Sequence, residues 1–313
     1  MGRPKKNPSA SGAYVSKKIH SLENTGDIIT ATDALWDIIL KRLLKMSRAY
    51  GFSKVETPLL EDARLYEIFF EASGKSGEAW SLEAQGKAAV LRPTLFPSVL
   101  RAYFQHKIFD TVPMSKWWYA GLTAKKGPKE TLSSDYEYGL EIFGTFTHLA
   151  EAQLISAVWE FLVSLGLSDL VLEINHIGEE ECQRVYQEAL GDYLNGKKYE
   201  LCDACNEHTK KRPLNVFRCQ NLDCQAVLSE APTVLDYLDE KNHKHFTNIL
   251  EALDELNIPY QLNPLYSGPE GHSRTNFTIK YKSKAQTLTL GEGGYHDRYM
   301  QQLCGKNFCS FGF

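Results

Sequence analysis

Residues 34–61, ALWDIILKRLLKMSRAYGFSKVETPLLE, join an amphipathic helix directly to a short apolar strand. Apolar side chains from Leu35 to Met46 recur at intervals of three and four residues, and Gly51 is suited to end the helix. Pro58 interrupts the apolar run that follows and cannot donate to a ladder, so this strand is expected at a sheet edge or an interface.

The remaining segments predict an α+β protein. Two β-rich segments, 116–122 and 136–144, flank a polar loop and predict a long hairpin. A charge-rich helical segment follows, and alternating β-signals return at 273–281 and 286–294.

This order of segments suggests an interrupted core. We expect a core of residues 25–176 and 259–313, with a helical inserted domain at 177–258. Residues 1–24 are expected to form a basic disordered arm, because their first 18 residues carry several cations and no acid.

Composition excludes some classes of function. The chain has 313 residues, is 43% hydrophobic and carries a net charge of −4, which gives no global field for a dedicated nucleic-acid binder. It contains no run of 18 apolar residues and no secretory signal, so we expect a cytoplasmic protein without membrane contact. In a reducing compartment, clustered cysteines are more often metal ligands than disulfides.

Four of the seven cysteines lie in residues 201–225, LCDACNEHTKKRPLNVFRCQNLDCQ. Cys202 and Cys205 form one pair and Cys219 and Cys224 a second, with thirteen residues between the pairs. This spacing favours a closed, structural zinc site, in which His208 could replace one ligand. The alternative is a set of thiols packed without metal as small hydrophobic groups.

Several of these segments, in this order, resemble histidyl-tRNA synthetases, which are class II aminoacyl-tRNA synthetases. Residues 34–61 are similar to the family's motif 1, and 90–107 (VLRPTLFPSVLRAYFQHK) to its Leu-Arg-Pro-Glu-Gly-Thr segment. Residues 135–144 resemble the second strand of motif 2, 172–178 (LEINHIG) match the strand that leaves the core, and 215–264 resemble the family's inserted domain.

The resemblance implies an antiparallel sheet flanked by helices, and a homodimer with motif 1 at its interface. It further implies a site for ATP, magnesium and histidine on the sheet face, and an insert that lies against the acceptor region of tRNA. These are the parts of an enzyme that activates histidine and transfers it to tRNA.

Several residues depart from the family's pattern. Counting back from Gly139, the motif 2 arginine that bridges ATP and histidine falls on Thr123, and the glutamate two residues later falls on Lys125. A second arginine aligns with Ser267, and the tyrosines of the imidazole pocket align with Gly271 and His272.

The segment that holds the amino group has changed as well: Thr94 and Phe96 replace the family's glutamate and threonine. The chain also stops at Phe313, before the motif 3 arginine and the anticodon-binding domain.

A smaller set of polar residues keeps the pattern. Arg92, Glu141, Arg274 and Asp297 match family positions, and Glu137 stands where the family has glutamine.

The loop lysines, among them Lys125, Lys126 and Lys129, offer point charges to a phosphate or form a solvated hairpin tip. The ligand-pocket candidates are therefore Arg92, Glu137, Glu141, Arg274, Lys125 and Lys126.

Loss of one preorganised donor typically costs about 10²-fold to 10³-fold in rate. We therefore expect a synthetase-like protein with impaired or absent adenylation, and whether it is an enzyme stays open. The alternatives are a non-catalytic paralogue, such as a module like the regulatory subunit of ATP phosphoribosyltransferase, and a truncated synthetase.

Overall fold

A computed structural model describes residues 20–73, 79–84, 86–127, 131–211, 213–265, 272–305 and 308–313. Most of the basic arm expected at 1–24 lies outside these ranges, as do Lys129, Ser267 and Gly271.

An eight-stranded sheet forms the centre of the molecule. Its strand order is β1 (Ser53–Lys54), β5 (Ser115–Lys126), β6 (Leu132–Phe143), β11 (Ser310–Gly312), β10 (Thr287–Tyr295), β9 (Ser273–Lys282), β7 (Leu170–His176) and β8 (Tyr260–Leu262). The inner strands pair in antiparallel fashion, and β5 and β6 form the long hairpin. The predicted α+β class is confirmed.

Only the two edge strands depart from an antiparallel arrangement. β1 pairs in parallel with β5, and β8 pairs in parallel with β7. The second pairing follows from chain connectivity, because a long helical connection separates β7 from β8 and returns the chain in the same direction.

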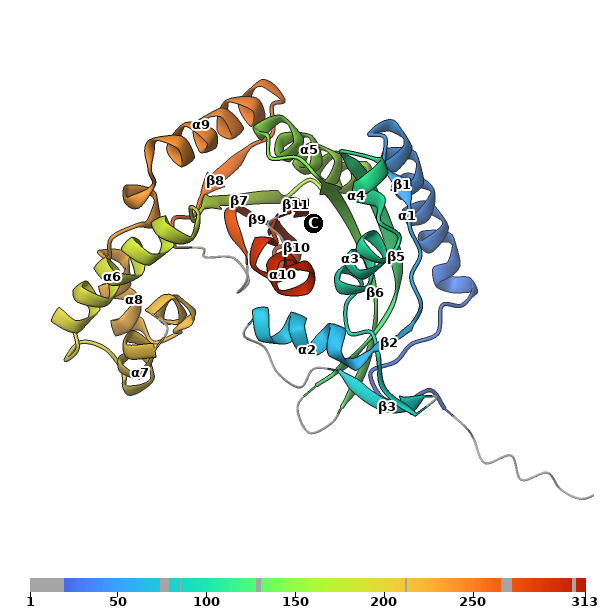
Figure 1. Ribbon diagram of the computed structural model, residues 1–313, viewed down its shortest axis with the longest axis horizontal. Coiled ribbons are helices and arrows are strands. Elements are labelled where there is room, and N and C mark those ends of the chain that lie inside the picture. The colour runs from blue at the N-terminus through green and yellow to red at the C-terminus, as the bar shows by residue number, and fades with distance from the viewer. Residues whose placement is uncertain are drawn as a thin grey trace, which may run out of the picture.

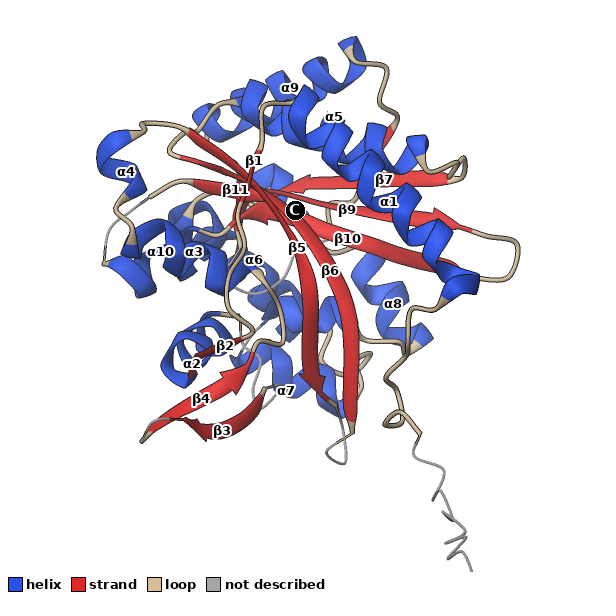
Figure 2. Ribbon diagram, turned by 90° about the vertical axis from the view of Figure 1, so that its right-hand side faces the viewer, coloured by secondary structure: helices blue, strands red, loops and turns tan. Residues whose placement is uncertain are grey.

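Helices cover both faces of the sheet (Figures 1 and 2). α1 (Thr30–Ala49), α5 (His148–Ser164) and α9 (Glu240–Glu255) pack on one face, with the core side chains Leu43, Val158 and Ile249. α2 (Ala63–Ala72), α3 (Phe96–Gln105) and α10 (Asp297–Cys304) cover the other, and α4 (Ile108–Thr111) follows α3.

The segment around Pro58 forms two short strands rather than the single strand expected from sequence. β1 ends at Lys54, and β2 (Leu60–Asp62) begins a separate three-stranded sheet with β4 (Lys87–Leu91) and β3 (Trp80–Ala84). Because proline lacks an N–H donor, it fits between the two ladders.

Residues 177–237 build a hydrophobic cluster of their own. Its helices are α6 (Glu180–Gly196), α7 (Asp203–Lys211), the 3₁₀ turn η2 (Pro213–Arg218), α8 (Leu222–Ser229) and the 3₁₀ turn η3 (Val234–Tyr237). Figure 1 shows this group to one side of the sheet. From there, α9 leads the chain back to the sheet. Leu190, Leu194 and Val216 are fully buried in the cluster.

Candidate ligand-binding pocket

A pocket of about 750 Å³ opens on the sheet face that α2, α3 and α10 cover. Strands β5, β6 and β10 form its floor. The floor carries Lys125 from β5, Glu137 and Glu141 from β6, and Glu292 from β10.

The pleat of the β5–β6 hairpin brings the floor residues together. Tyr119 pairs with Gly139, and Gly121 pairs with Glu137, so alternate residues of both strands point to the same side. A Cβ at position 139 would lie 2.4 Å from the Tyr119 ring, and the glycine there leaves room for that ring.

Glu141 lies at the closed end of the pocket. Its carboxyl group is fully buried, and it accepts hydrogen bonds from the Ser310 hydroxyl at 2.7 Å and from the Tyr119 hydroxyl at 3.4 Å. Burial raises the pKa of Glu141 to about 8, although the two hydroxyl groups oppose this shift. At pH 7 the side chain is therefore largely a neutral acid.

Glu137 fixes the start of α3. Its Oε1 atom accepts from the backbone N–H of Leu95 and from the Thr94 hydroxyl, both at 2.8 Å. Burial raises the pKa of Glu137, and these hydrogen bonds act in the opposite direction. Thr94, which takes the place of a family glutamate, thus positions a neighbouring carboxylate.

Two histidines and a phenylalanine form an aromatic wall of the pocket. The rings of Phe96 and His296 lie 4.0 Å apart between centroids, and His272 meets His296 edge to face at 4.5 Å. Burial lowers the pKa of His296 to about 4, so this imidazole is neutral at pH 7. The wall is therefore aromatic, and its His296 ring carries no charge at pH 7.

The lysines of the hairpin differ in position. Lys125 lines the pocket and lies 3.5 Å from Asp135, whereas Lys126 lies over the Trp80 ring at 5.2 Å. Thr123 points to the same side of β5 as Lys125 but is buried, and its hydroxyl donates to the Asp135 carbonyl. Of the three, Lys125 alone lines the pocket.

Arg92 does not line the pocket. It is buried, and its guanidinium donates to the carbonyls of Thr57, Pro58 and Leu122 and to the Thr57 hydroxyl. A Cβ at position 121 would lie 2.6 Å from Nη2 of Arg92, so Gly121 gives the guanidinium room. Arg92 therefore stabilises the turn around Pro58.

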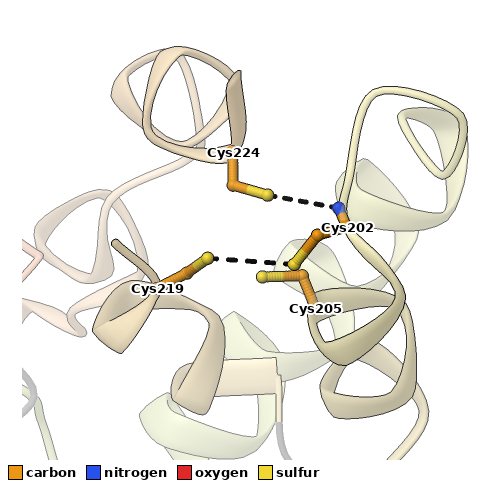
Figure 3. A group of neighbouring side chains, drawn as sticks. All are labelled: Cys202, Cys205, Cys219 and Cys224. Carbon is orange, nitrogen blue, oxygen red and sulfur yellow. Dashed lines mark hydrogen bonds between the residues drawn. The ribbon is translucent and has the colours of Figure 1, made fainter. Parts of the chain in front are cut away.

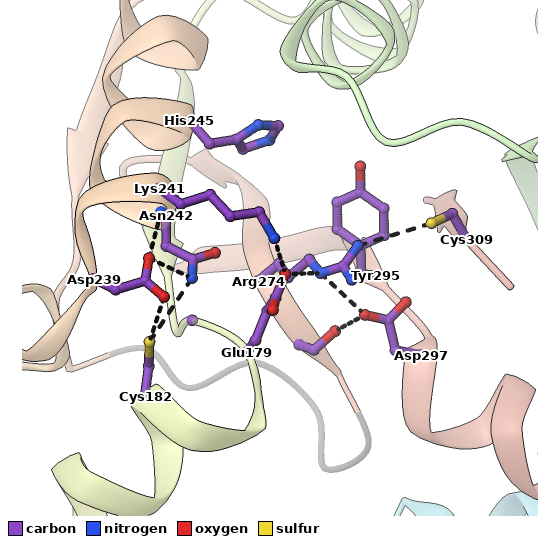
Figure 4. A network of polar contacts seen from close by, with 12 residues as sticks. Glu179, Cys182, Asp239, Lys241, Asn242, His245, Arg274, Tyr295, Asp297 and Cys309 are labelled. Carbon is purple, nitrogen blue, oxygen red and sulfur yellow. Dashed lines mark hydrogen bonds and ion pairs between the residues drawn. The ribbon is translucent and has the colours of Figure 1, made fainter. Parts of the chain in front are cut away.

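Arg274 also lies outside the lining, in a network that joins α6, α9 and α10 (Figure 4). Its Nε atom lies 3.3 Å from the Asp297 carboxylate and 3.6 Å from that of Glu179, and its guanidinium lies 4.1 Å above the Phe146 ring. Arg274 has a φ of 53°, a region that non-glycine residues seldom adopt.

Backbone hydrogen bonds hold Arg274 in this conformation. Its N–H donates to the Gly178 carbonyl, and its own carbonyl accepts from the N–H of Ile177. Asp297 in turn accepts from the Ser273 hydroxyl at 2.6 Å and does not line the pocket. Both Arg274 and Asp297 are thus engaged with intramolecular partners.

The charge of the pocket follows from these placements. Among the described lining residues, Lys125 is the only lysine or arginine, against the carboxyl groups of Asp135, Glu137, Glu141 and Glu292. Sequence reasoning missed Tyr119 and Ser310, the hydroxyl partners of Glu141. The two-residue alternation of β5 could have indicated Tyr119, but Ser310 comes from a strand far along the chain.

The four cysteines expected to bind metal lie together in the helical cluster (Figure 3). Their sulfur atoms all lie within 4.8 Å of one another. Cys205 and Cys224 are buried, whereas Cys202 and Cys219 are half-buried. His208 is not part of this group.

A largely antiparallel sheet with helices on both faces, and a polar pocket on one face, defines a class II aminoacyl-tRNA synthetase-like core. A family model described as histidyl-tRNA synthetase matches residues 34–313. The chain belongs to this family.

Curated relatives support this assignment. The chain is 29% identical to a histidine–tRNA ligase of Halothermothrix orenii over 295 residues, which cover 92% of the chain and 70% of the relative. It is 30% identical to one of Dehalococcoides mccartyi over 302 residues, or 94% of the chain and 72% of the relative.

Solved structures share the fold. Apo histidyl-tRNA synthetase of S. aureus superimposes with a TM-score of 0.75 at 23% identity, over 94% of this chain and 70% of that one. A Bacillus halodurans protein described as an ATP phosphoribosyltransferase regulatory subunit/histidyl-tRNA synthetase superimposes with a TM-score of 0.70 at 16% identity. This match covers 100% of this chain and 81% of that one. In the described part of the chain, no helix has the length and apolarity to cross a bilayer.

Proposed function

We propose that this protein binds histidine in the pocket of a synthetase-like core and activates it poorly or not at all. One observation carries this proposal: the described lining contains no arginine, while Arg92 and Arg274 are engaged with other parts of the protein.

Charge balance explains the expected loss of activation. Adenylation requires cationic donors for the triphosphate of ATP and for the carboxylate of the amino acid, and arginine suits both because its planar fork binds two oxygens at once. Among the described lining residues, a single ammonium group, that of Lys125, faces four carboxyl groups. The carboxylates could hold magnesium, but the donor set does not fit a triphosphate.

The same pocket suits the cationic end of an amino acid. Glu137 and Glu141 lie on its floor, and Glu141 matches a family carboxylate near the α-amino group. The wall formed by the rings of Phe96, His272 and His296 offers stacking and hydrogen bonding to an imidazole. These features support histidine as ligand without requiring its activation.

Two measurements on the same preparation test the proposal. Isothermal calorimetry should detect histidine binding, and ATP–pyrophosphate exchange with histidine should remain at background at high protein concentration, with an active histidyl-tRNA synthetase as positive control. Histidine-dependent exchange would contradict the loss of adenylation, and absence of histidine binding would contradict the binding role.

A regulatory role is the second candidate, because a pocket that binds an amino acid without activating it can serve as a sensor. In that case histidine should alter the activity of an added ATP phosphoribosyltransferase catalytic subunit. An unchanged activity with saturating histidine would remove this candidate while leaving the binding role intact.

The proposal includes a homodimer, supported by exposed apolar side chains on α1 and near Pro58. Leu35, Ile38, Leu40, Leu59 and Leu60 are all more than one third exposed. Sedimentation equilibrium should give twice the chain mass, and a monomer at micromolar concentration would contradict it.

We further propose that residues 177–258 form an inserted domain that contacts tRNA, and that the protein acts in the cytoplasm, where translation takes place. Fluorescence anisotropy with labelled histidine tRNA tests the contact. An equal affinity for a non-cognate tRNA would argue against a histidine-specific role.

A further inference from the structure

We propose that Cys202, Cys205, Cys219 and Cys224 hold one zinc ion in a closed, structural site within the helical segment. The proposal is independent of the pocket, since these residues lie in the cluster of residues 177–237 and not in the pocket lining.

The first argument is the convergence of four sulfur atoms. Tetrahedral zinc with four thiolates at about 2.3 Å places its sulfurs about 3.8 Å apart. Sγ of Cys202 and Sγ of Cys219 lie 3.9 Å apart, and all four sulfurs lie within 4.8 Å of one another. Metal binding therefore requires the sulfur–sulfur distances to shorten by at most about 1 Å.

The second argument is the direction of nearby backbone N–H groups. The N–H of Cys202 points at Sγ of Cys224 over 3.2 Å (Figure 3). The N–H of Asn221 points at Sγ of Cys219 over 3.5 Å. A neutral thiol is a weak acceptor, whereas a metal-bound thiolate carries charge that such donors stabilise. The amides are thus arranged as outer partners of charged sulfur ligands.

The third argument is the origin of the ligands. Cys202 directly precedes α7 and Cys205 lies in its first turn, Cys219 follows η2, and Cys224 lies in α8. These elements are short, and a metal ion that links all of them would supply the folding free energy that a small apolar cluster lacks.

Disulfides do not account for the arrangement. A disulfide joins two sulfurs at about 2.05 Å and gives no reason for a second pair to converge on the first. Because four sulfur ligands fill a tetrahedral site, no coordination position remains for substrate, and we assign the ion a structural role only.

Metal content of the untagged full-length protein, purified without chelators, tests the proposal directly. Elemental analysis by mass spectrometry should find about one zinc ion per chain. Cys202→Ser and Cys224→Ser should each reduce the zinc content at least several-fold. Cys304→Ser should leave it unchanged, since Cys304 lies in α10, outside the group.

Cobalt substitution keeps the test valid if the serine variants fail to fold. The wild-type protein exchanged into Co²⁺ should show strong visible absorption of a tetrahedral site and thiolate-to-metal charge transfer in the near ultraviolet. X-ray absorption of the zinc form should show four sulfur neighbours at about 2.3 Å.

Metal removal should have a local effect. Limited proteolysis after chelation should cut within residues 200–225 first, while histidine binding, measured separately, persists. A protein that contains no zinc after expression in zinc-supplemented medium, or that binds Co²⁺ without thiolate charge transfer, would overturn the proposal.

Discussion

Oε1 of Glu141 lies 3.6 Å from Nε2 of His296, inside the pocket and away from solvent. Burial shifts the two pKa values in opposite directions, to about 8 for Glu141 and to about 4 for His296. Near neutral pH the pair is therefore a protonated acid beside a neutral imidazole, and not an ion pair.

The first prediction concerns stability between pH 6.5 and 8. The folded pKa of Glu141, about 8, lies above its ordinary value of 4.5, so its favourable contribution is complete below pH 4.5 and is lost as pH rises from 4.5 to about 8. His296 has a depressed folded pKa, so its contribution is lost only as pH falls below 6.5.

Above pH 6.5, therefore, only Glu141 of these two residues makes the stability depend on pH. The wild-type protein should lose up to about 1.4 kcal/mol of unfolding free energy per pH unit relative to Glu141→Gln. Urea unfolding of both proteins at pH 6.5 and pH 8 measures this difference. Parallel pH profiles would show that Glu141 titrates normally.

The second prediction is that histidine binding at pH 7 releases a proton. An ammonium group placed near Glu141 favours the ionised carboxylate and lowers its pKa from about 8. The calorimetric enthalpy of binding should therefore differ between buffers of low and high ionisation enthalpy, and Glu141→Gln should remove the difference. Equal enthalpies for the wild-type protein would place the ligand's cation elsewhere.

The third prediction separates two adjacent lysines. Lys125→Met should weaken residual ATP binding by about 3-fold to 10-fold, because Lys125 supplies the only ammonium group of the described lining. Lys126→Met is the matched control, since Lys126 lies over Trp80. Competition with a fluorescent ATP analogue measures both, and equal effects would assign the charge to the loop as a whole.

The fourth prediction concerns Arg92. Arg92→Met should destabilise the protein by about 2 to 5 kcal/mol, since it leaves the carbonyls of Thr57, Pro58 and Leu122 without their donor. Arg64→Met is the control: Arg64 is exposed and pairs with Asp62 in solvent, so its loss should change the stability little compared with Arg92→Met.

Chemical denaturation measures both changes. If Arg92→Met instead lowers ligand affinity with no loss of stability, Arg92 belongs to the pocket and the proposed function requires revision.

Much of the fold could be predicted because its signals are local. The β-rich segments 116–122 and 136–144 on either side of a polar loop indicated the β5–β6 hairpin, and apolar spacing indicated α1. The break at Pro58 was visible, but its result, two strands in two different sheets, depends on partners that come later in the chain. The small sheet and the short helix α10 were not predicted for the same reason.

The candidate site was predicted less completely. Glu137 and Glu141 lie in the pocket because strand alternation fixes which side of β6 they share. Counting residues placed the family's arginine at Thr123, but the cation of that strand that lines the pocket is Lys125. Sequence cannot distinguish residues two apart on one face, since both point the same way and only packing buries one.

The sequence by itself determined the α+β class, the family resemblance and the close spacing of four cysteines, because helix and strand periodicity and short-range spacing are properties of neighbouring residues. Only the tertiary structure decided that Arg92 and Arg274 face intramolecular partners, and that Ser310 reaches Glu141. A long side chain can reach several sites, and the site that it occupies depends on which distant segments fold beside it.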